Sequence, residues 1–276
     1  MNVLEYMKRA LELARRGAGL VSPNPMVGAV LVKDGQVVGE GYHRYDWLKH
    51  AEVCAIDMAG DLAAGSTLYC TLEPCCHHGR TPPCTDALIE AGITRAIIAM
   101  KDPDPRVSGR GIELLRNAGI SVEVGLCEEE ASKVNEAYLK FIQRQIPFVT
   151  VAIVDPSATW KPSEESLERA SEADAILLGS VDSVNLLVAS YSIRRVRHRP
   201  LIIIGTTGEL DRFRASGVLP PDDPRASLVE IDNSRFEVAL AKLVELRAHS
   251  VYAICGQGVG ANELLRVADR VIADEG

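Results

Sequence analysis

Two short stretches decide how the first half of this chain must fold. They are residues 50–52, His-Ala-Glu, and residues 73–84, Glu-Pro-Cys-Cys-His-His-Gly-Arg-Thr-Pro-Pro-Cys. The imidazole of His50 and the thiolates of Cys75 and Cys84 form a donor set that binds Zn²⁺ and leaves a fourth position for water. The pattern therefore predicts that the fold brings these three side chains, distant in sequence, around one metal ion.

A carboxylate accompanies this donor set, because Glu52 follows the histidine by two residues. Water bound to zinc loses a proton near neutral pH, and the hydroxide can attack an amino-bearing carbon of a pyrimidine or purine. The leaving amine must then be protonated, and Glu52 can carry the proton to it. His-x-Glu followed by Pro-Cys and a second Cys is the pattern of zinc-dependent base and nucleoside deaminases, although the loop between the cysteines is longer here.

Two other interpretations of the same residues are open. The thiols could be small buried apolar groups unrelated to the histidine, or the zinc site could be purely structural, with Cys76 as a fourth ligand. We favour a catalytic site, because Glu52 and two Pro-Cys units fit that pattern together. The remaining cysteines are expected in the core: Cys54, Cys70, Cys127 and Cys255.

Composition narrows the class of protein. The chain has 276 residues, of which 47% are hydrophobic, and a net charge of −8. This length suggests one or two domains. An acidic chain without a long basic tract argues against a nucleic-acid or membrane partner, and we find no apolar run long enough to span a bilayer. Seven cysteines without an apolar leader favour reduced thiols and a cytoplasmic protein.

Alternating apolar runs and amphipathic stretches predict an α/β fold in both halves. In the first half we expect helices over 3–16, 50–60, 85–92, 111–119 and 128–145, and strands over 27–32, 37–42, 67–72, 94–100 and 122–125. Asp34-Gly35 between the first two of these strands predicts a hairpin. In the second half we expect helices over 163–173, 235–248 and 261–267, and strands over 148–154, 175–178, 201–204, 229–231, 251–254 and 270–273. Pro147 ends the last helix of the first half, so we place the domains at 1–146 and 147–276.

Further motifs resemble the deaminase domain of the bacterial riboflavin-biosynthesis deaminase/reductase family. They occur in order over 22–30, 39–43, 50–53, 71–84 and 102–105, and the resemblance covers residues 1–145. It implies a cytidine-deaminase-like three-layer domain followed by a smaller dihydrofolate-reductase-like α/β domain. It also implies hydrolytic deamination of 2,5-diamino-6-ribosylamino-4(3H)-pyrimidinone 5′-phosphate to 5-amino-6-(5-phosphoribosylamino)uracil, and from the family alone a homo-oligomer is plausible.

The resemblance also assigns residues to the substrate. Asn24, between two prolines, would line the base pocket, where its amide can donate and accept. His43 and His77 would be pocket residues, and Arg80 would hold the ribose phosphate. The alternatives are a turn-forming Asn, packing or surface histidines and a solvated Arg. The chain departs from the family at 47–49, where Trp-Leu-Lys replaces Gly-Gly-Pro before the histidine ligand.

The second half resembles the family's NADPH-dependent reductase, but its functional pieces differ. Residues 154–159 replace a Ser-Leu-Asp-Gly-Lys segment, residues 179–182 replace a Gly-x-Gly-Thr turn, and Cys255 stands where a Glu is expected. Because few donors are left to cradle phosphate, we expect no NADPH binding and a dimerising or stabilising module without reductase activity. The Arg-rich run 194–199 could bind phosphate, but a solvated charge run is the simpler interpretation.

Four functions therefore remain open. The first is a monofunctional zinc deaminase of riboflavin biosynthesis that acts on a small phosphorylated pyrimidine. A bifunctional deaminase/reductase with an altered cofactor site is the second. The third is a zinc deaminase of another aminopyrimidine or purine, for which the change at 47–49 leaves room. A zinc-stabilised interaction protein without catalysis is the fourth.

Overall fold

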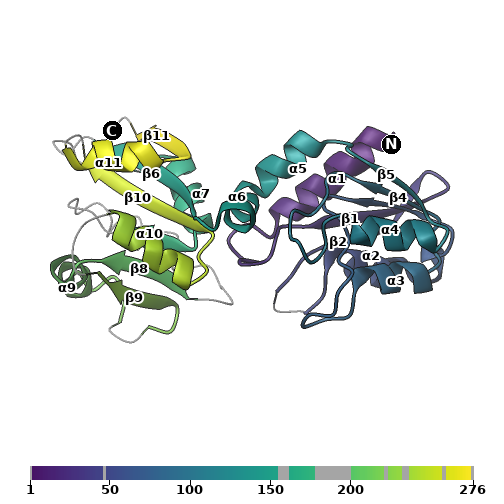
Figure 1. The fold of residues 1–276 in the computed structure, drawn as a ribbon, viewed down its shortest axis with the longest axis horizontal. Helices are drawn as coiled ribbons and strands as arrows, with labels where there is room; N and C mark the ends of the chain where they lie inside the picture. Colours follow the sequence, from purple (N-terminus) through teal and green to yellow (C-terminus); the bar gives the residue numbers. More distant parts are fainter. Residues whose placement is uncertain are drawn as a thin grey trace. The chain divides into compact units, whose positions relative to one another are not determined.

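The computed structural model of the chain describes residues 2–45, 48–154, 162–177, 200–220, 223–231, 236–256 and 259–274. The chain divides into two compact units, Met1–Gln143 and Arg144–Gly276 (Figure 1). Each unit has its own sheet, with five strands in the first and six in the described part of the second. The predicted α/β fold of both halves is confirmed. Among the described helices, none is long and apolar enough to cross a bilayer.

The first unit is built on a mixed sheet with the order β2-β1-β3-β4-β5. Its strands are β1 (Gly28–Lys33), β2 (Gln36–Tyr42), β3 (Thr67–Cys70), β4 (Arg95–Ile98) and β5 (Ser121–Val124). β1 is antiparallel to β2 and β3, whereas β3, β4 and β5 are parallel. The predicted hairpin is confirmed: Asp34 and Gly35 connect β1 to β2 with φ of 50° and 74°, the paired positive angles that a tight hairpin turn requires.

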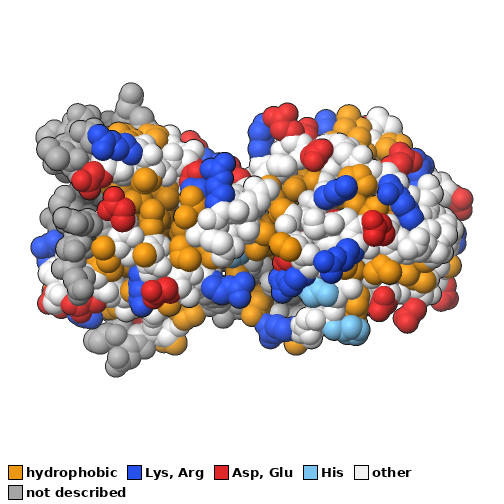
Figure 2. All heavy atoms as spheres, in the orientation of Figure 1, with side chains coloured by type: hydrophobic (Ala, Val, Ile, Leu, Met, Phe, Trp, Pro, Cys, Tyr) orange, Lys and Arg blue, Asp and Glu red, His pale blue; other side chains and the backbone are white. Residues whose placement is uncertain are grey.

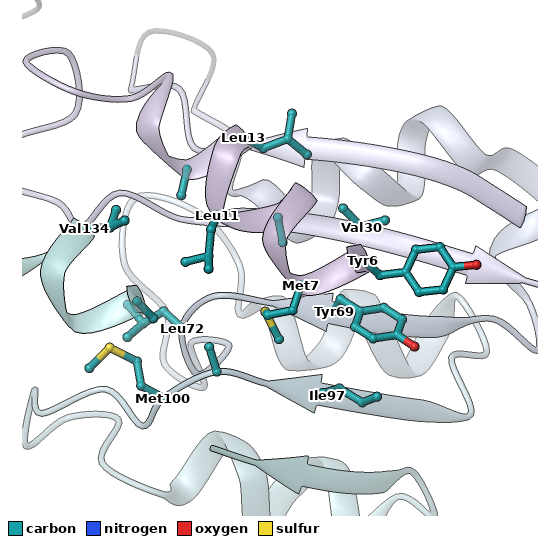
Figure 3. Packing of buried hydrophobic residues seen from close by; sticks show 14 of the residues in the cluster. Tyr6, Met7, Leu11, Leu13, Val30, Tyr69, Leu72, Ile97, Met100 and Val134 are labelled. Carbon is teal, nitrogen blue, oxygen red and sulfur yellow. The ribbon is translucent and has the colours of Figure 1, made fainter. Parts of the chain in front are cut away.

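Helices cover both faces of this sheet. They are α1 (Val3–Arg15), α2 (Ala51–Ala59) with a following 3-10 turn (Gly60–Ala63), α3 (Cys84–Glu90), α4 (Arg110–Asn117), α5 (Glu128–Val134) and α6 (Glu136–Arg144). α1 and α5 contribute to the cluster of Figure 3, which includes Met7, Leu11, Val30, Tyr69, Ile97 and Val134. Side chains from α2, α3 and α4 join the cluster that includes Ala29, Leu31, Ala55, Leu68, Leu88, Ile98 and Leu115. Neighbouring residues of one strand thus belong to the two clusters on opposite faces of the sheet. The sheet and the helices on its two faces form three layers.

One predicted helix of the first unit is wrong in its extent. Instead of a single helix over 128–145, the chain forms α5 and α6, which meet at Asn135. This residue leaves the helical conformation, with φ −108° and ψ 19°. Its side chain bonds the backbone of Met26, far away in sequence, and this tertiary contact outweighs the amphipathic pattern that predicted continuity.

The second unit has a parallel sheet in the order β11-β6-β10-β7-β8-β9. Its strands are β6 (Phe148–Val154), β7 (Ala175–Leu177), β8 (Leu201–Gly205), β9 (Ala226–Glu230), β10 (Ser250–Gly256) and β11 (Arg270–Asp274), and its described helices are α7 (Glu164–Glu172), α9 (Thr207–Ala215), α10 (Phe236–Glu245) and α11 (Val259–Val267). The sequence did not predict α9, although Thr206 and Glu209 form a capping box at its start.

Close contact between α2 and the β1–β2 hairpin fixes the start of this helix. A Cβ atom added to Gly41 would lie 2.1 Å from the carbonyl oxygen of Ala51, and one added to Gly39 would lie 2.1 Å from that of Ala55. These separations are far below van der Waals contact, so only glycine permits the approach. The first turn of α2, which carries Glu52, is thereby held directly over β2.

Replacing Gly41 by alanine should therefore destabilise the first unit. The added methyl group must push α2 off the hairpin, at a cost of about 3 kcal/mol and a fall in Tm of about 10 °C. Thermal unfolding of the full-length protein measures this. Gly79→Ala is the matched control, because nothing lies within 4 Å of a Cβ at that position. Equal Tm values for the two variants would contradict this account of the helix contact.

Candidate metal centre and active site

Three segments bring the predicted ligands together. His50 immediately precedes α2, Cys75 lies in the loop after β3, and Cys84 is the first residue of α3. The His50 Nδ1 atom lies 3.0 Å from Cys84 Sγ and 3.4 Å from Cys75 Sγ. All three ligand atoms lie within 4.8 Å of one another, an arrangement of His, Cys, Asp or Glu donors that is not repeated elsewhere in the described part of the chain.

This donor set fits zinc. Zn–N bonds of about 2.0 Å and Zn–S bonds of about 2.3 Å place nitrogen and sulfur about 3.5 Å apart in a tetrahedral site, close to the separations seen here. The backbone N–H of Cys84 also donates to Cys75 Sγ at 3.3 Å, a contact that favours a thiolate. Cys76, which a purely structural zinc site would use as its fourth ligand, is directed elsewhere. Its Sγ atom lies 3.7 Å from the carbonyl oxygen of Arg106.

The pKa values of the two candidate ligand thiols are shifted in opposite directions. The pKa of Cys75 is lowered to about 4, chiefly because it accepts a hydrogen bond from the Cys84 thiol and also because His50 lies beside it. The pKa of Cys84 is raised for the complementary reason, together with its burial. A divalent cation in the site would displace the Cys84 proton and hold both sulfurs as thiolates.

Glu52 is the buried carboxyl group of the site. It is the second residue of α2, and its side chain is only 3% exposed. His50 has an extended backbone, with φ −82° and ψ 164°, so helical periodicity does not turn its side chain away from Glu52. Burial raises the pKa of Glu52, although the neighbouring His50 acts in the opposite direction. A buried carboxyl group with a raised pKa is suited to proton transfer.

Contacts with Thr81 and His43 orient the ring of His50. His50 Nε2 lies 3.3 Å from Thr81 Oγ1, and the His43 ring meets the His50 ring edge-on at 5.2 Å between centroids. His43 Nδ1 donates to the carbonyl oxygen of Lys49 at 3.1 Å, so its Nε2 can accept from Asn24 Nδ2 at 3.2 Å. The structure therefore joins the predicted Asn24 and His43 to the metal group. Thr81, which contacts the second ring nitrogen of His50, was not predicted from the sequence.

The other two predicted substrate residues lie on the loop between the cysteines. Arg80 is exposed, and its guanidinium lies 4.8 Å from the centre of the Tyr45 ring. His77 is half-buried, and its Nδ1 atom is shielded from solvent without a hydrogen-bond partner in the described residues. Of the departure at 47–49, Trp47 lies outside the described residues, whereas Lys49 provides the carbonyl oxygen that orients His43.

The sequence analysis also missed the role of Glu73. This carboxylate is 3% exposed and accepts hydrogen bonds from four backbone N–H groups. They belong to Asp102, Gly109, Gly111 and Ile112, at 3.3, 2.9, 2.9 and 3.2 Å. Because three of these lie at or near the start of α4, the carboxylate anchors that helix to the residue that precedes Pro74 and Cys75. Glu73 therefore fixes the backbone that leads into Cys75, one of the three residues that could hold a metal ion.

The equivalent features of the second half are only partly described. Cys255 is buried at the end of β10. Residues 155–159 and 179–182, where the resemblance places the differing cofactor segments, and the Arg-rich run 194–199 lie outside the described residues.

Fold and site together define a class. A three-layer α/β unit that gathers one histidine, two cysteines and a buried glutamate at the starts of two helices is a zinc-dependent deaminase domain. A family model, described as the cytidine and deoxycytidylate deaminase zinc-binding region, matches residues 1–100.

Comparison with individual proteins gives the family. The diaminohydroxyphosphoribosylamino-pyrimidine deaminase of Buchnera aphidicola is 49% identical over 142 residues, which cover 51% of this chain and 97% of that protein. The riboflavin biosynthesis protein RibD of Aquifex aeolicus is 50% identical over 188 residues, which cover 63% of this chain and 53% of that protein. The chain belongs to the riboflavin-biosynthesis pyrimidine deaminase family.

The likeness extends to the second unit. A diaminohydroxyphosphoribosylaminopyrimidine deaminase/5-amino-6-(5-phosphoribosylamino)uracil reductase from Thermotoga maritima matches with a TM-score of 0.81 and 34% identity, covering 98% of this chain and 85% of that one. The chain thus has a cytidine-deaminase-like domain followed by a reductase-like α/β domain, as predicted. It nevertheless spans about half the length of curated relatives such as the Aquifex protein, 53% of which is matched.

The two neighbouring cysteines offer a sharp test of the metal centre. Cys75→Ser should lower zinc affinity by more than about 100-fold, because even the loss of a group that merely orients a ligand costs 10- to 100-fold. Cys76→Ser, which differs by one position, should bind zinc like the native protein. Zinc per chain after dialysis, and competition with a chromogenic chelator, measure both. Equal zinc loss in the two variants would show that Cys75 is not a ligand.

Proposed function

We propose that this protein catalyses the hydrolytic, zinc-dependent deamination of 2,5-diamino-6-ribosylamino-4(3H)-pyrimidinone 5′-phosphate to 5-amino-6-(5-phosphoribosylamino)uracil in riboflavin biosynthesis. The observation that carries the proposal is the convergence of His50, Cys75 and Cys84 beside the buried Glu52. The name of the Buchnera relative, almost all of which is matched, supports the choice of reaction.

The proposed mechanism assigns the zinc to His50, Cys75 and Cys84. Bound zinc supplies a Lewis acid that makes a coordinated water acidic near neutral pH. With zinc in place, Glu52 would take the two protons that the water loses in turn, giving the first to the ring nitrogen and the second to the amine, which leaves as ammonia. Its burial suits this role, because the carboxyl group is screened from bulk water and its raised pKa allows it to be protonated during the cycle.

Asn24 and Arg80 would select the substrate. With one N–H of Asn24 directed to His43 at 3.2 Å, the amide oxygen and the second N–H are suited to a pyrimidine edge. Arg80 lies over the Tyr45 ring, which leaves the in-plane donors of the guanidinium for a ribose phosphate. His77 adds a polar group on the loop that carries Arg80.

A small phosphorylated molecule also suits the surface better than a nucleic acid does. On the face shown in Figure 2, acidic and basic side chains of the described residues are interspersed, and they form no continuous basic stripe there. We place the reaction in the cytoplasm, because the seven cysteines are free thiols and a reducing compartment would keep the ligands reduced.

For the second unit we propose a stabilising or dimerising role without NADPH-dependent reduction. Cys255, a small thiol buried at the end of β10, stands where the family has a glutamate, which supports this proposal. A bifunctional deaminase/reductase is the second candidate, since the likeness to the Thermotoga deaminase/reductase covers 98% of this chain.

Replacing Glu52 by glutamine tests the deamination. The variant keeps the size of the side chain but cannot relay protons, so turnover should fall by at least about 1,000-fold while zinc content is unchanged. Ammonia release from the diaminopyrimidinone ribosyl phosphate measures turnover, and metal analysis of the same sample measures zinc. A zinc-loaded variant with native turnover would refute the proton-shuttle role, and a native protein without turnover would refute the function.

Mass spectrometry of the product formed with NADPH present tests the second unit. We expect a deaminated product that retains the closed ribose, and no saturable change in NADPH fluorescence on titration with protein. A product carrying two additional hydrogens would instead establish the bifunctional enzyme. The Thermotoga deaminase/reductase, assayed in parallel, is the positive control.

A further inference from the structure

The break between α5 and α6 holds a reciprocal pair of hydrogen bonds. The backbone N–H of Met26 donates to Asn135 Oδ1 at 2.8 Å, and Asn135 Nδ2 donates to the carbonyl oxygen of Met26 at 2.8 Å. Asn135 is only 2% exposed. A buried amide with both ends paired is directional, because the two bonds fix both position and orientation of the strand-like segment that it meets.

This pair reaches the proposed substrate pocket through a short stretch of backbone. Met26 is two residues from Asn24, and the carbonyl oxygen of the next residue, Val27, accepts the backbone N–H of His43 at 2.9 Å. Asn24 Nδ2 in turn lies 3.2 Å from His43 Nε2. The side chain of Asn135 therefore fixes the position of the segment that carries Asn24 and the Val27 carbonyl group, which accepts the backbone N–H of His43.

A second contact from the same helical segment reaches the other neighbouring loop. Tyr138, three residues beyond Asn135, donates from its hydroxyl to Asp102 Oδ1 at 3.0 Å. Asp102 Oδ1 also accepts the backbone N–H of Asp104 at 2.9 Å, which shapes the loop after β4. That loop meets the cysteine loop, because the carbonyl oxygen of Arg106 lies 3.7 Å from Cys76 Sγ.

We propose that Asn135 and Tyr138 are positioning residues that hold these two loops, and with them the pyrimidine pocket, in register with the metal group. The inference rests on the proposed function. Neither residue touches the reacting atoms. Asn135 acts through Met26 on Asn24, and Tyr138 acts through Asp102.

Loss of the Asn135 contact should weaken substrate binding more than it slows the chemical step. The proposed function assigns Asn24 to binding the base and Glu52 to proton transfer, so displacement of Asn24 weakens ground state and transition state alike. Such a loss raises KM and leaves kcat unchanged. A role in folding alone would instead lower Tm and the fraction of active enzyme without altering KM.

Asn135→Asp is the sharpest variant, because it keeps the shape and the acceptor for the Met26 N–H but removes the donor to the Met26 carbonyl group. In zinc-loaded full-length protein we expect KM to rise about tenfold with kcat within about twofold. Asn117→Asp, the same change at an exposed position at the end of α4, is the matched control. Tyr138→Phe, which removes only the hydroxyl, should raise KM in the same direction. An unchanged KM in Asn135→Asp, whatever its Tm, would overturn the proposal.

A measurement without substrate separates this inference from the proposed function. Long-range ¹H–¹⁵N spectra of the histidine rings report the hydrogen bond between Asn24 and His43. We expect the His43 Nε2 resonance to shift in Asn135→Asp and to stay in place in Asn117→Asp. A spectrum identical to that of the native protein would refute the positioning role. A native protein without turnover would refute only the function, because this shift does not depend on it.

Discussion

The contact of α2 with the β1–β2 hairpin is the constraint on which the site depends. Glycine at position 41 lets the carbonyl oxygen of Ala51 approach the strand backbone, where any side chain would be in collision. The start of the helix is therefore fixed relative to the sheet, and with it His50 and Glu52. The metal group is then completed by two cysteines, one at each end of the loop of residues 76–83. The positions of the site residues thus depend first on backbone packing and not on the metal.

Two buried carboxyl groups near this group show how environment divides their roles. Glu73 accepts four backbone N–H groups, most of them near the start of α4, so its charge is fully used in holding structure. Glu52 is equally buried, but it faces the ligands His50 and Cys84 in place of a ring of amides. Four N–H donors occupy the carboxylate of Glu73 in holding structure, whereas Glu52, beside the candidate ligands, is placed to move a proton. The same residue type therefore serves as an anchor in one position and, in the proposed function, as a proton carrier in the other.

Much of the fold and the metal group could be predicted from the sequence, because the signals are local. Asp34-Gly35 between two apolar runs predicted the hairpin, and the His-x-Glu and Pro-Cys units predicted the ligands that the structure brings together. What could not be predicted depends on partners distant in the chain. Asn135 breaks a helix whose amphipathic pattern is continuous, because its partner Met26 lies 109 residues away. From its neighbours in the sequence, Glu73 is part of a cysteine motif, yet its four hydrogen-bond partners follow it by 29 to 39 residues.

These long-range contacts share a physical logic. Loops after β-strands carry the groups that meet substrate, but a loop has few contacts of its own to fix its height above the sheet. The structure supplies them with buried polar side chains from elsewhere: Glu73 for the start of α4, Asn135 for the segment before β1, and Tyr138 for the loop after β4. Each is a neutral or charged group whose partners are backbone or carboxylate atoms, so a substitution leaves a buried polar group unpaired. The geometry of the site therefore depends as much on these anchors as on the residues that would contact the pyrimidine.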